Sequence, residues 1–329
     1  MSDADRVARV MALGFTERQA RFLVTVMLHG GICIQRQYCA SARLVHGDKT
    51  RAFFRELVAK RLATPYPCAR SGARVYHMHN KALYAAIGEA DNRNRRLMSV
   101  SRAIEGLIVL DAVLGAPKVK WLATSQEKLA YFTQTTRLRP EDMPQLVFQN
   151  AGGRTVRHFP DKLPIGVHPD GDTHEFVYVV NRQIPVDFRP YLYRHARLLS
   201  VLPAWVVRLL VPRHLEEAEF PFRRACEEEL GARLAPSTVE ELRWYFRARR
   251  ALNEPGASID RERFRRARRA FGGARYQVLY RHWLAHGDAL INALDSPVLS
   301  EALARGSGRI ESYVVHRRYH HLTPLVGTA

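Results

Sequence analysis

The segment AIEGLIVLDAVL, residues 103–114, constrains the fold most, because it is apolar almost all round. A helix with this pattern has no face for solvent, so we expect it to be buried. Further along, the run WVVRLLV from Trp205 to Val211 predicts a fully buried strand that ends at Pro212. With 47% hydrophobic and 25% charged residues, the chain can bury a normal core. We therefore expect a multidomain chain of α+β or α/β class.

Shorter elements fill the region between these two segments. The sequence predicts a strand at 120–124, a helix from Ser125 to near Thr136, a strand at 155–159 with its hairpin partner at 175–180, and a helix at 190–202. The order helix, three strands, helix, strand, with one extra helix after the first strand, is that of the PD-(D/E)xK nuclease core. That core is a mixed sheet with helices on both faces. We place this domain at residues 97–212.

The acids of such a nuclease hold Mg²⁺, which requires hard oxygen ligands in octahedral geometry. Pro160-Asp161 stands where the first acid is expected, and a helix acid, Glu105 or Asp111, could supply a further ligand. The partner strand begins with Glu175, but two residues later Val177 stands where a lysine is expected. The interior of that strand contains no acid, so the second half of the metal site is incomplete.

Three interpretations of this domain stay open. If the site register falls at Val180, then Arg182 occupies the lysine position, and an arginine repels the metal and cannot act as a base. Asp170 and Asp172 belong to a Pro-Asp-Gly-Asp run that is typical of a hairpin turn. The domain is a degenerate nuclease fold that binds DNA or a partner, or an unrelated α/β domain, or an active Mg²⁺-dependent nuclease. The catalytic candidates for the last case are Asp161, Glu175 and Glu105.

Residues 13–88 carry the clearest local pattern. Thr16-Glu-Arg-Gln19 is a capping box that opens a helix, and Gly30-Gly31 ends it. A short second helix is predicted at 35–44 and a third at 49–61, followed by alternating apolar residues around a hairpin turn at Ser71-Gly72. Three helices and a hairpin in this order indicate an N-terminal winged helix-turn-helix, whose third helix enters the major groove of DNA. A winged helix used for protein contacts is the alternative.

The third helix has one apolar face and one polar, basic face. We expect the polar face to read bases, since arginine and lysine match guanine edges in the major groove. The turn of the hairpin would hold two further arginines near the phosphate backbone or the minor groove. The predicted DNA contacts in this domain are Lys49, Thr50, Arg51, Arg55, Arg70 and Arg74.

From residue 213 to 329 the pattern changes to helices with acidic and basic blocks. Residues 241–281 contain twelve arginines and four acids, with aromatic residues between them. This predicts a C-terminal basic helical region that binds DNA or a partner, with arginines toward phosphates and aromatics in the core. An ordinary amphipathic helix pair is the alternative. The predicted phosphate contacts are Arg243, Arg247, Arg250, Arg265, Arg266 and Arg269.

The charge balance favours a nucleic acid as the partner. Lysine and arginine number 51 against 32 aspartate and glutamate, which gives a net charge of +19. Such an excess of positive charge is suited to a polyanion, and we expect double-stranded DNA. The four cysteines are sparse and irregular in spacing, so we expect no metal site. Because no signal peptide or membrane span is evident, we expect a cytoplasmic protein, associated with the bacterial nucleoid when bound.

Over about residues 13–212 the chain resembles the replication-relaxation-like winged-helix proteins of bacterial mobile genetic elements. The resemblance rests on the wing pattern, on Trp121-Leu-Ala-Thr124 and on Pro160-Asp161. It implies a role in plasmid or element maintenance, transfer or recombination. A looser likeness is to the endonuclease subunit of heteromeric transposases, in which the domain order is reversed.

The sequence therefore supports three hypotheses about function. The main one is a non-catalytic DNA-binding accessory or regulatory protein of a mobile genetic element, with no cofactor. The second is a Mg²⁺-dependent DNA endonuclease with displaced acids. The third is a scaffold that recruits a recombinase or transposase to DNA. A palindromic footprint would indicate a homodimer.

Overall fold

The computed structural model describes residues 1–316, except 69–72, 151–152, 232–233, 253–258, 293 and 295. This part of the chain contains helices together with a three-stranded sheet, a five-stranded sheet and a two-stranded ribbon. The protein is thus of mixed α and β type, and the larger sheet is itself mixed in strand direction, as expected. Among the described helices, none is long and apolar enough to cross a membrane.

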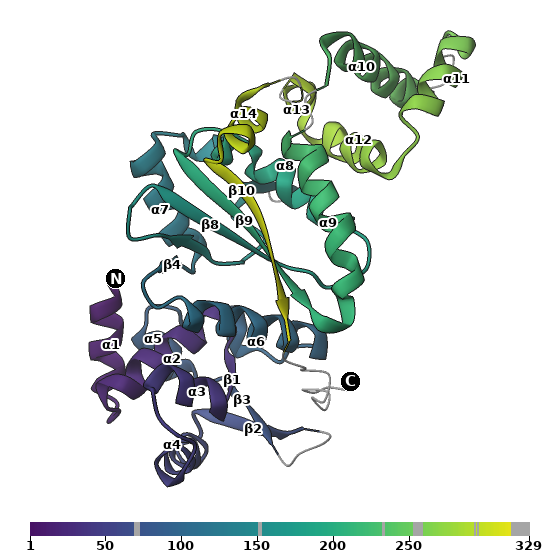
Figure 1. Cartoon of the computed structure of the whole chain (residues 1–329). Coiled ribbons are helices and arrows are strands. Elements are labelled where there is room, and N and C mark those ends of the chain that lie inside the picture. Colours follow the sequence, from purple (N-terminus) through teal and green to yellow (C-terminus); the bar gives the residue numbers. More distant parts are fainter. Residues whose placement is uncertain are drawn as a thin grey trace.

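Between residues 17 and 78 the N-terminal unit contains the three predicted helices and the hairpin in the expected order, together with a strand, β1, that was not predicted. Thr16 and Gln19 form the expected capping box at the start of α2. The three strands form an antiparallel sheet in the order β1-β3-β2 (Figure 1). The elements are α1 (Asp3–Met11), α2 (Glu17–His29), β1 (Ile32–Ile34), α3 (Gln35–Ala42), α4 (Asp48–Ala59), β2 (Ala63–Pro67), β3 (Arg74–Met78) and α5 (Lys81–Ala86).

An aromatic cluster holds α3 and α4 together and so fixes which face of α4 meets solvent. The ring of Tyr38 lies 4.5 Å from that of Phe53, which in turn lies 5.2 Å from the ring of Phe54. All three side chains are buried, as is Leu57 one turn later. Aromatic pairs at these separations add stabilisation beyond the apolar area that they bury. The opposite face of α4 is left exposed.

The central unit is built on a five-stranded sheet with the order β10-β9-β8-β7-β4. β8, β9 and β10 run parallel, whereas β7 is antiparallel to both of its neighbours. Helix α8 (Phe188–Leu199) makes the crossover that a parallel β8–β9 pair requires. The strands are β4 (Lys120–Leu122), β7 (Ile165–Val167), β8 (Thr173–Val179), β9 (Ala204–Pro212) and β10 (Gly308–Val315).

The predicted pairing of 155–159 with 175–180 is wrong. Residues 153–158 form β6 (Gly153–His158), which pairs with β5 (Gln145–Asn150) in a separate ribbon, and the hairpin partner of β8 is β7. The backbone of Phe159 and of Lys162 adopts positive φ, at 45° and 57°, on either side of Pro160-Asp161. This turn ends β6 and allows a new strand to begin at Ile165. A short 3-10 helix, η2 (Pro140–Asp142), precedes the ribbon.

Helix α6 (Val100–Gly115) packs between the N-terminal unit and the sheet, which confirms that 103–114 is a buried helix. On one side its apolar residues meet Ile32 and Val75, and on the other they meet Val177 and Val179 of β8. Figure 1 shows α6 in this intermediate layer. A short 3-10 helix, η1 (Arg93–Arg95), leads into it. One continuous apolar cluster therefore joins the two units.

The contact between α2 and α6 brings two backbones together at paired glycines. A Cβ built on Gly30 would lie 3.1 Å from the Cα of Gly106, so no larger side chain fits there without displacement. Next to this contact, the side-chain amide of Gln37 donates to the carbonyl of Leu107 at 2.9 Å. Close backbone approach and a buried hydrogen bond thus fix the position of α6 on the N-terminal unit.

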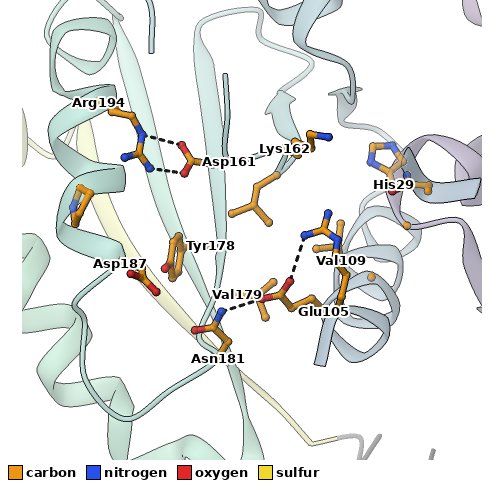
Figure 2. A pocket seen from close by; sticks show the side chains of 16 residues that line it. His29, Glu105, Val109, Asp161, Lys162, Tyr178, Val179, Asn181, Asp187 and Arg194 are labelled. Carbon is orange, nitrogen blue, oxygen red and sulfur yellow. Dashed lines mark hydrogen bonds and ion pairs between the residues drawn. The ribbon is translucent and has the colours of Figure 1, made fainter. Parts of the chain in front are cut away.

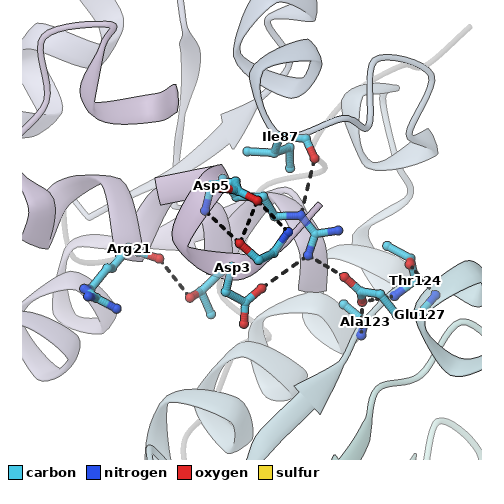
Figure 3. Close-up of polar contacts among 10 residues, drawn as sticks. Asp3, Asp5, Arg21, Ile87, Ala123, Thr124 and Glu127 are labelled. Atoms are coloured by element: carbon cyan, nitrogen blue, oxygen red, sulfur yellow. Dashed lines mark hydrogen bonds and ion pairs between the residues drawn. The ribbon is translucent and has the colours of Figure 1, made fainter. Parts of the chain in front are cut away.

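A buried arginine joins the first helix to the central unit. Arg6 of α1 donates from Nε to the carbonyl of Ile87 at 3.3 Å and pairs through Nη1 with Glu127 of α7 (Ser125–Thr136) (Figure 3). Glu127 also accepts the backbone amides of Ala123 and Thr124. Burial would raise the pKa of Glu127, but these amides and Arg6 outweigh it and lower the pKa.

The face of the sheet opposite α6 is covered by α7, α8, α9 (Glu219–Cys226) and α14 (Val298–Arg305), all in one apolar cluster with the strands. Two short helices, η3 (Arg213–Ala218) and η4 (Glu227–Gly231), flank α9. Residues 213–231 and 298–315 thus pack with the central unit, although they fall in the predicted C-terminal helical region. β10 in particular continues the sheet beside β9, where a helical region was expected.

Between α9 and α14 lies a helical insertion with a core of its own. Tyr245, Phe246 and Trp283 are buried in it, which confirms that aromatic residues of this region form a core. The buried carboxylate of Glu229 anchors the insertion, because it pairs with both Arg189 of α8 and Arg275 of α12. The helices are α10 (Pro236–Ala251), α11 (Arg261–Ala270), α12 (Ala274–His286) and α13 (Ala289–Asn292).

Candidate functional site

A cavity of about 290 Å³ opens where α6, the Pro160-Asp161 turn, the end of β8 and α8 meet. Because Ile165 of β7 pairs with Phe176 of β8, the turn before β7 lies beside the residues that end β8. Two of the three predicted catalytic candidates, Asp161 and Glu105, line this cavity. We call it the acid pocket, and Figure 2 shows its side chains.

Asp161 is held by an arginine that the sequence did not suggest. Arg194 of α8 donates from Nε to Oδ2 of Asp161 at 3.2 Å and from Nη2 to Oδ1. Both carboxylate oxygens are therefore engaged, and the two side chains are largely buried, at 12% and 21% exposure. A bidentate pair of this kind is among the strongest polar contacts in proteins.

Glu105, on the other side of the acid pocket, also has polar partners at both of its carboxylate oxygens. Its Oε1 accepts the side-chain amide of Asn181 at 2.9 Å, and its Oε2 lies 3.7 Å from Arg102. Burial lowers the pKa of Arg102, and Glu105 partly offsets that effect. Figure 2 shows the two acids turned apart, each toward its own partner.

The third candidate, Glu175, lies elsewhere. It stands near the start of β8 and is not among the residues that line the acid pocket. Its buried carboxylate contacts Nε of Arg208 at 3.1 Å and Nε2 of His168 at 3.1 Å. Asp111, the other helix acid considered from the sequence, pairs with Arg36. The structure thus brings together Asp161 and Glu105 and leaves Glu175 and Asp111 outside.

The acid pocket does not fit a Mg²⁺ ion as its side chains stand. Magnesium needs several oxygen ligands at once, whereas both acids already accept hydrogen bonds and Arg194, Arg102 and Lys162 place positive charge beside them. Within the described ranges, no group of three or more His, Cys, Asp and Glu side chains is arranged to hold a metal.

Two buried basic residues lie behind the pocket. Lys128 donates from Nζ to the carbonyl of Leu163 at 2.6 Å, and burial lowers its pKa to about 8 although Asp161 opposes the shift. His195 is buried among aromatic rings and donates from Nδ1 to the carbonyl of Tyr191 at 2.8 Å. Burial lowers its pKa to about 4, so this histidine is neutral at pH 7.

Three of the four residues on the α4 face that was predicted to read bases are confirmed as exposed. Lys49, Arg51 and Arg55 are exposed, and Arg51 pairs with Asp48 at 2.8 Å. The fourth residue, Thr50, cannot read a base. It is fully buried, with its hydroxyl 3.4 Å from the sulfur of Cys39. The α4 surface is therefore Lys49, Arg51 and Arg55.

In the predicted wing, Arg74 is exposed at the start of β3, and Arg70 lies outside the described residues. In the insertion, the expected arginines fall into two groups. Those of α10 have partners within the insertion, since Arg243 and Arg247 pair with Asp288 and Arg250 lies over the ring of Trp283, although Arg247 and Arg250 are also exposed. Those of α11 are exposed. The α11 surface consists of Arg261, Arg265, Arg266, Arg268 and Arg269, of which Arg266 pairs with Glu262.

Several residues of the acid pocket were missed from the sequence. Lys162 follows Asp161 directly, and this adjacency was the one signal available. Arg194 and Asn181 gave no signal, because their proximity to the acids depends on how α8 and β8 pack.

Comparison with known proteins identifies no relative of this chain. No protein-family model, no curated protein and no solved structure matches this chain.

Proposed function

We propose that the protein is a DNA-binding accessory or regulatory protein of a mobile genetic element, with no catalysis of its own. The single observation that carries this proposal is the α4 surface. Its basic side chains are exposed on α4, which is the third helix in the run α2, β1, α3, α4, β2, β3, and the strands of this run form the β1-β3-β2 sheet. A winged helix-turn-helix has this order of elements and inserts that helix into the major groove. Lys49, Arg51 and Arg55 would then contact base edges.

The charge distribution supports a second kind of contact. The α11 surface gathers five arginines on one short helix, in a chain with a net charge of +19. Arginines of this kind contact phosphates and strengthen binding to any DNA sequence. In this proposal the α4 surface supplies specificity and the α11 surface supplies affinity. The acid pocket is then a structural remnant of a nuclease-like fold, and a recombinase or transposase of the same element would carry out the chemistry.

The test begins with selection of preferred duplexes from a random library by the full chain. Affinity for a selected duplex and for a scrambled one is then measured with the wild type, with Arg55→Ala and with Arg265→Ala/Arg269→Ala. We expect Arg55→Ala to weaken selected DNA by about 1–3 kcal/mol and to leave scrambled DNA nearly unchanged. The α11 variant should weaken both duplexes alike and lower the salt dependence.

Two results would contradict this division. If Arg55→Ala weakens selected and scrambled DNA equally, then the α4 surface does not read sequence. If the wild type enriches no sequence from the library, the protein does not bind DNA specifically.

One observation keeps a nuclease as the second candidate. Asp161 and Glu105 line the same cavity, beside a sheet that is mixed in strand direction, as the sheet of the nuclease core is. Nicking of supercoiled DNA with Mg²⁺ or Mn²⁺, and its loss in Asp161→Ala, would support this candidate. We expect no nicking by either protein.

A further inference from the structure

A second cavity, of about 720 Å³, lies next to the acid pocket and between the two units of the chain. One wall is the segment 88–96, which connects α5 to α6, and the other is the amino end of α7 together with β6. Lys162 and Arg102 line both cavities. In Figure 2 the side chain of Lys162 extends away from Asp161, toward the side where His29 lies. We call this second cavity the cleft.

Positive charge dominates the cleft. Its lining contains five cationic side chains and two carboxylates, Glu89 and Asp91. Glu89 accepts a hydrogen bond from Asn92. Four of the cations form what we call the cleft cluster, namely Arg96, Arg102, Arg157 and Lys162. The fifth is Arg93.

The cleft cluster has few counter-charges. Among the described residues, Arg96, Arg157 and Lys162 form no ion pair, and Arg102 has Glu105 at 3.7 Å. Arg93 has a buried Nε with no hydrogen-bond partner in the described part of the chain. By contrast, Arg194, Arg189 and Arg275 each meet a carboxylate directly. A buried donor without an acceptor is costly, so an acceptor from outside the chain would stabilise it.

The cations also repel one another. Burial is the main reason why the pKa of Lys162 is lowered to about 8, and Arg157, Arg102 and Arg96 lower it further. Lys162 is held in this position by a turn with positive φ, which costs free energy in a residue other than glycine. Ser125 and Gln126, at the amino end of α7, also line the cleft, and the helix dipole favours negative charge there.

We propose that the cleft binds a phosphate group through the cleft cluster and Arg93. Arginine forks and a lysine ammonium match the oxygens of a phosphate in geometry and charge. The phosphate belongs either to a nucleic-acid strand or to a free phosphate compound. This site uses none of the residues of the α4 and α11 surfaces, so it stands even if the proposed function fails.

The first experiment measures binding of inorganic pyrophosphate to the full chain by calorimetry. The variant Arg157→Gln/Lys162→Gln removes two members of the cleft cluster. The matched control is Lys118→Gln/Arg213→Gln, because it also removes one lysine and one arginine, and both are exposed and lie outside the two cavities. We expect the cleft variant to bind pyrophosphate at least about tenfold more weakly than the wild type, and the control to bind as the wild type does.

The second experiment needs no variant. Acylation of lysines in the wild type, followed by mass spectrometry, measures how fast Lys162 reacts, and its lowered pKa should make it react faster than the exposed Lys118. Pyrophosphate or a random-sequence oligonucleotide, single- or double-stranded, is then added. Protection by both identifies the nucleic-acid backbone as the ligand, and protection by pyrophosphate alone identifies a free phosphate compound. Absence of protection by either, or equal affinity of the two double variants for pyrophosphate, overturns the proposal.

Discussion

Asp161 illustrates how far a short motif predicts a residue's environment. Pro160-Asp161 was expected at the end of a strand of the core sheet, but that strand, β6, belongs to a separate ribbon, and the acid reaches the sheet through the turn before β7. Its partner Arg194 lies 33 residues away on α8, and only the packing of that helix places the two together. The same limit applies to Asn181 and Glu105. The motif thus indicated an acid near the sheet, but neither the strand pairing around it nor its ion pair with Arg194.

Arg194→Leu should destabilise the protein by about 3 kcal/mol, because it leaves the carboxylate of Asp161 largely buried without its partner. Asp161→Asn/Arg194→Leu should recover most of that loss, since no buried charge is left unpaired. Urea unfolding of the wild type, both single variants and the double variant measures this coupling. Additive effects of the two substitutions would show that the pair is not coupled.

The buried His195 should make the stability of the protein depend on pH. Burial lowers its pKa in the folded state to about 4, whereas an unfolded chain has a histidine pKa of about 6.5. The unfolded state therefore binds more protons between these values, and stability falls as pH decreases from 6.5 to 4. Asp161, Arg194 and Lys128 are the charged groups around the ring.

Between pH 7 and pH 5 we expect His195 to account for a loss on the order of 2 kcal/mol in the free energy of unfolding. His195→Gln should show a correspondingly smaller loss over the same range, because glutamine does not titrate. Urea titrations of both proteins at the two pH values test this. The same pH dependence in both would assign the effect to other groups.

Among the elements, α4 shows what helical periodicity can and cannot predict. The apolar residues Phe53, Phe54 and Leu57 were correctly placed in the core. Thr50 stands three, four and seven residues before them, so the same spacing puts it on the buried face. Its polar character led us to expect it on the surface. Spacing was the better guide.

Thr50→Arg should therefore destabilise the protein by about 3 kcal/mol or more, since it buries a charge with no partner. Thr50→Val keeps the shape of the side chain and should change stability by no more than about 1 kcal/mol. Thermal and urea unfolding of the two variants provide the comparison. A Thr50→Arg variant with wild-type stability would mean that this face of α4 is open to solvent.

The glycine contact between α2 and α6 gives a second prediction for elements. In Gly30→Ala the new Cβ meets the backbone of Gly106 at 3.1–3.3 Å, so the helices must move apart, at a cost of about 1–3 kcal/mol. In Gly106→Ala the nearest atom lies at 3.4 Å, and alanine favours the helix by about 1 kcal/mol. We expect only Gly30→Ala to lower the unfolding midpoint. Equal effects would show that this contact is not tightly packed.

For the whole molecule, local pattern predicted most helices and missed long-range pairing. The helices at 17–29, 35–42, 48–59, 100–115 and 125–136 all lie near their predicted positions. β10 was missed because a helical insertion separates it from its partner β9 in the sequence. A parallel pair of strands also carries no turn signal in the sequence. The chain therefore returns to its central sheet after residues that were expected to form a separate region.

If the α4 and α11 surfaces contact one DNA duplex, as proposed, their separation predicts how long that duplex must be. Figure 1 shows α4 and α11 at opposite ends of the molecule. A folded chain of 329 residues is on the order of 50 Å across, which corresponds to about 15 base pairs. Arg265→Ala/Arg269→Ala should thus weaken binding to a duplex clearly longer than this and leave binding to a shorter one unchanged. Equal weakening on both lengths would contradict the assigned positions of the two contacts.

We propose that the α4 surface reads DNA sequence. The most direct test compares the affinity of the wild type for a selected duplex with its affinity for a scrambled duplex of equal length, at equal salt. Specific DNA-binding proteins prefer their site by a factor of about 10³ or more. We predict a preference of at least that order, reduced by Arg55→Ala. Equal affinity for the two duplexes would contradict the account.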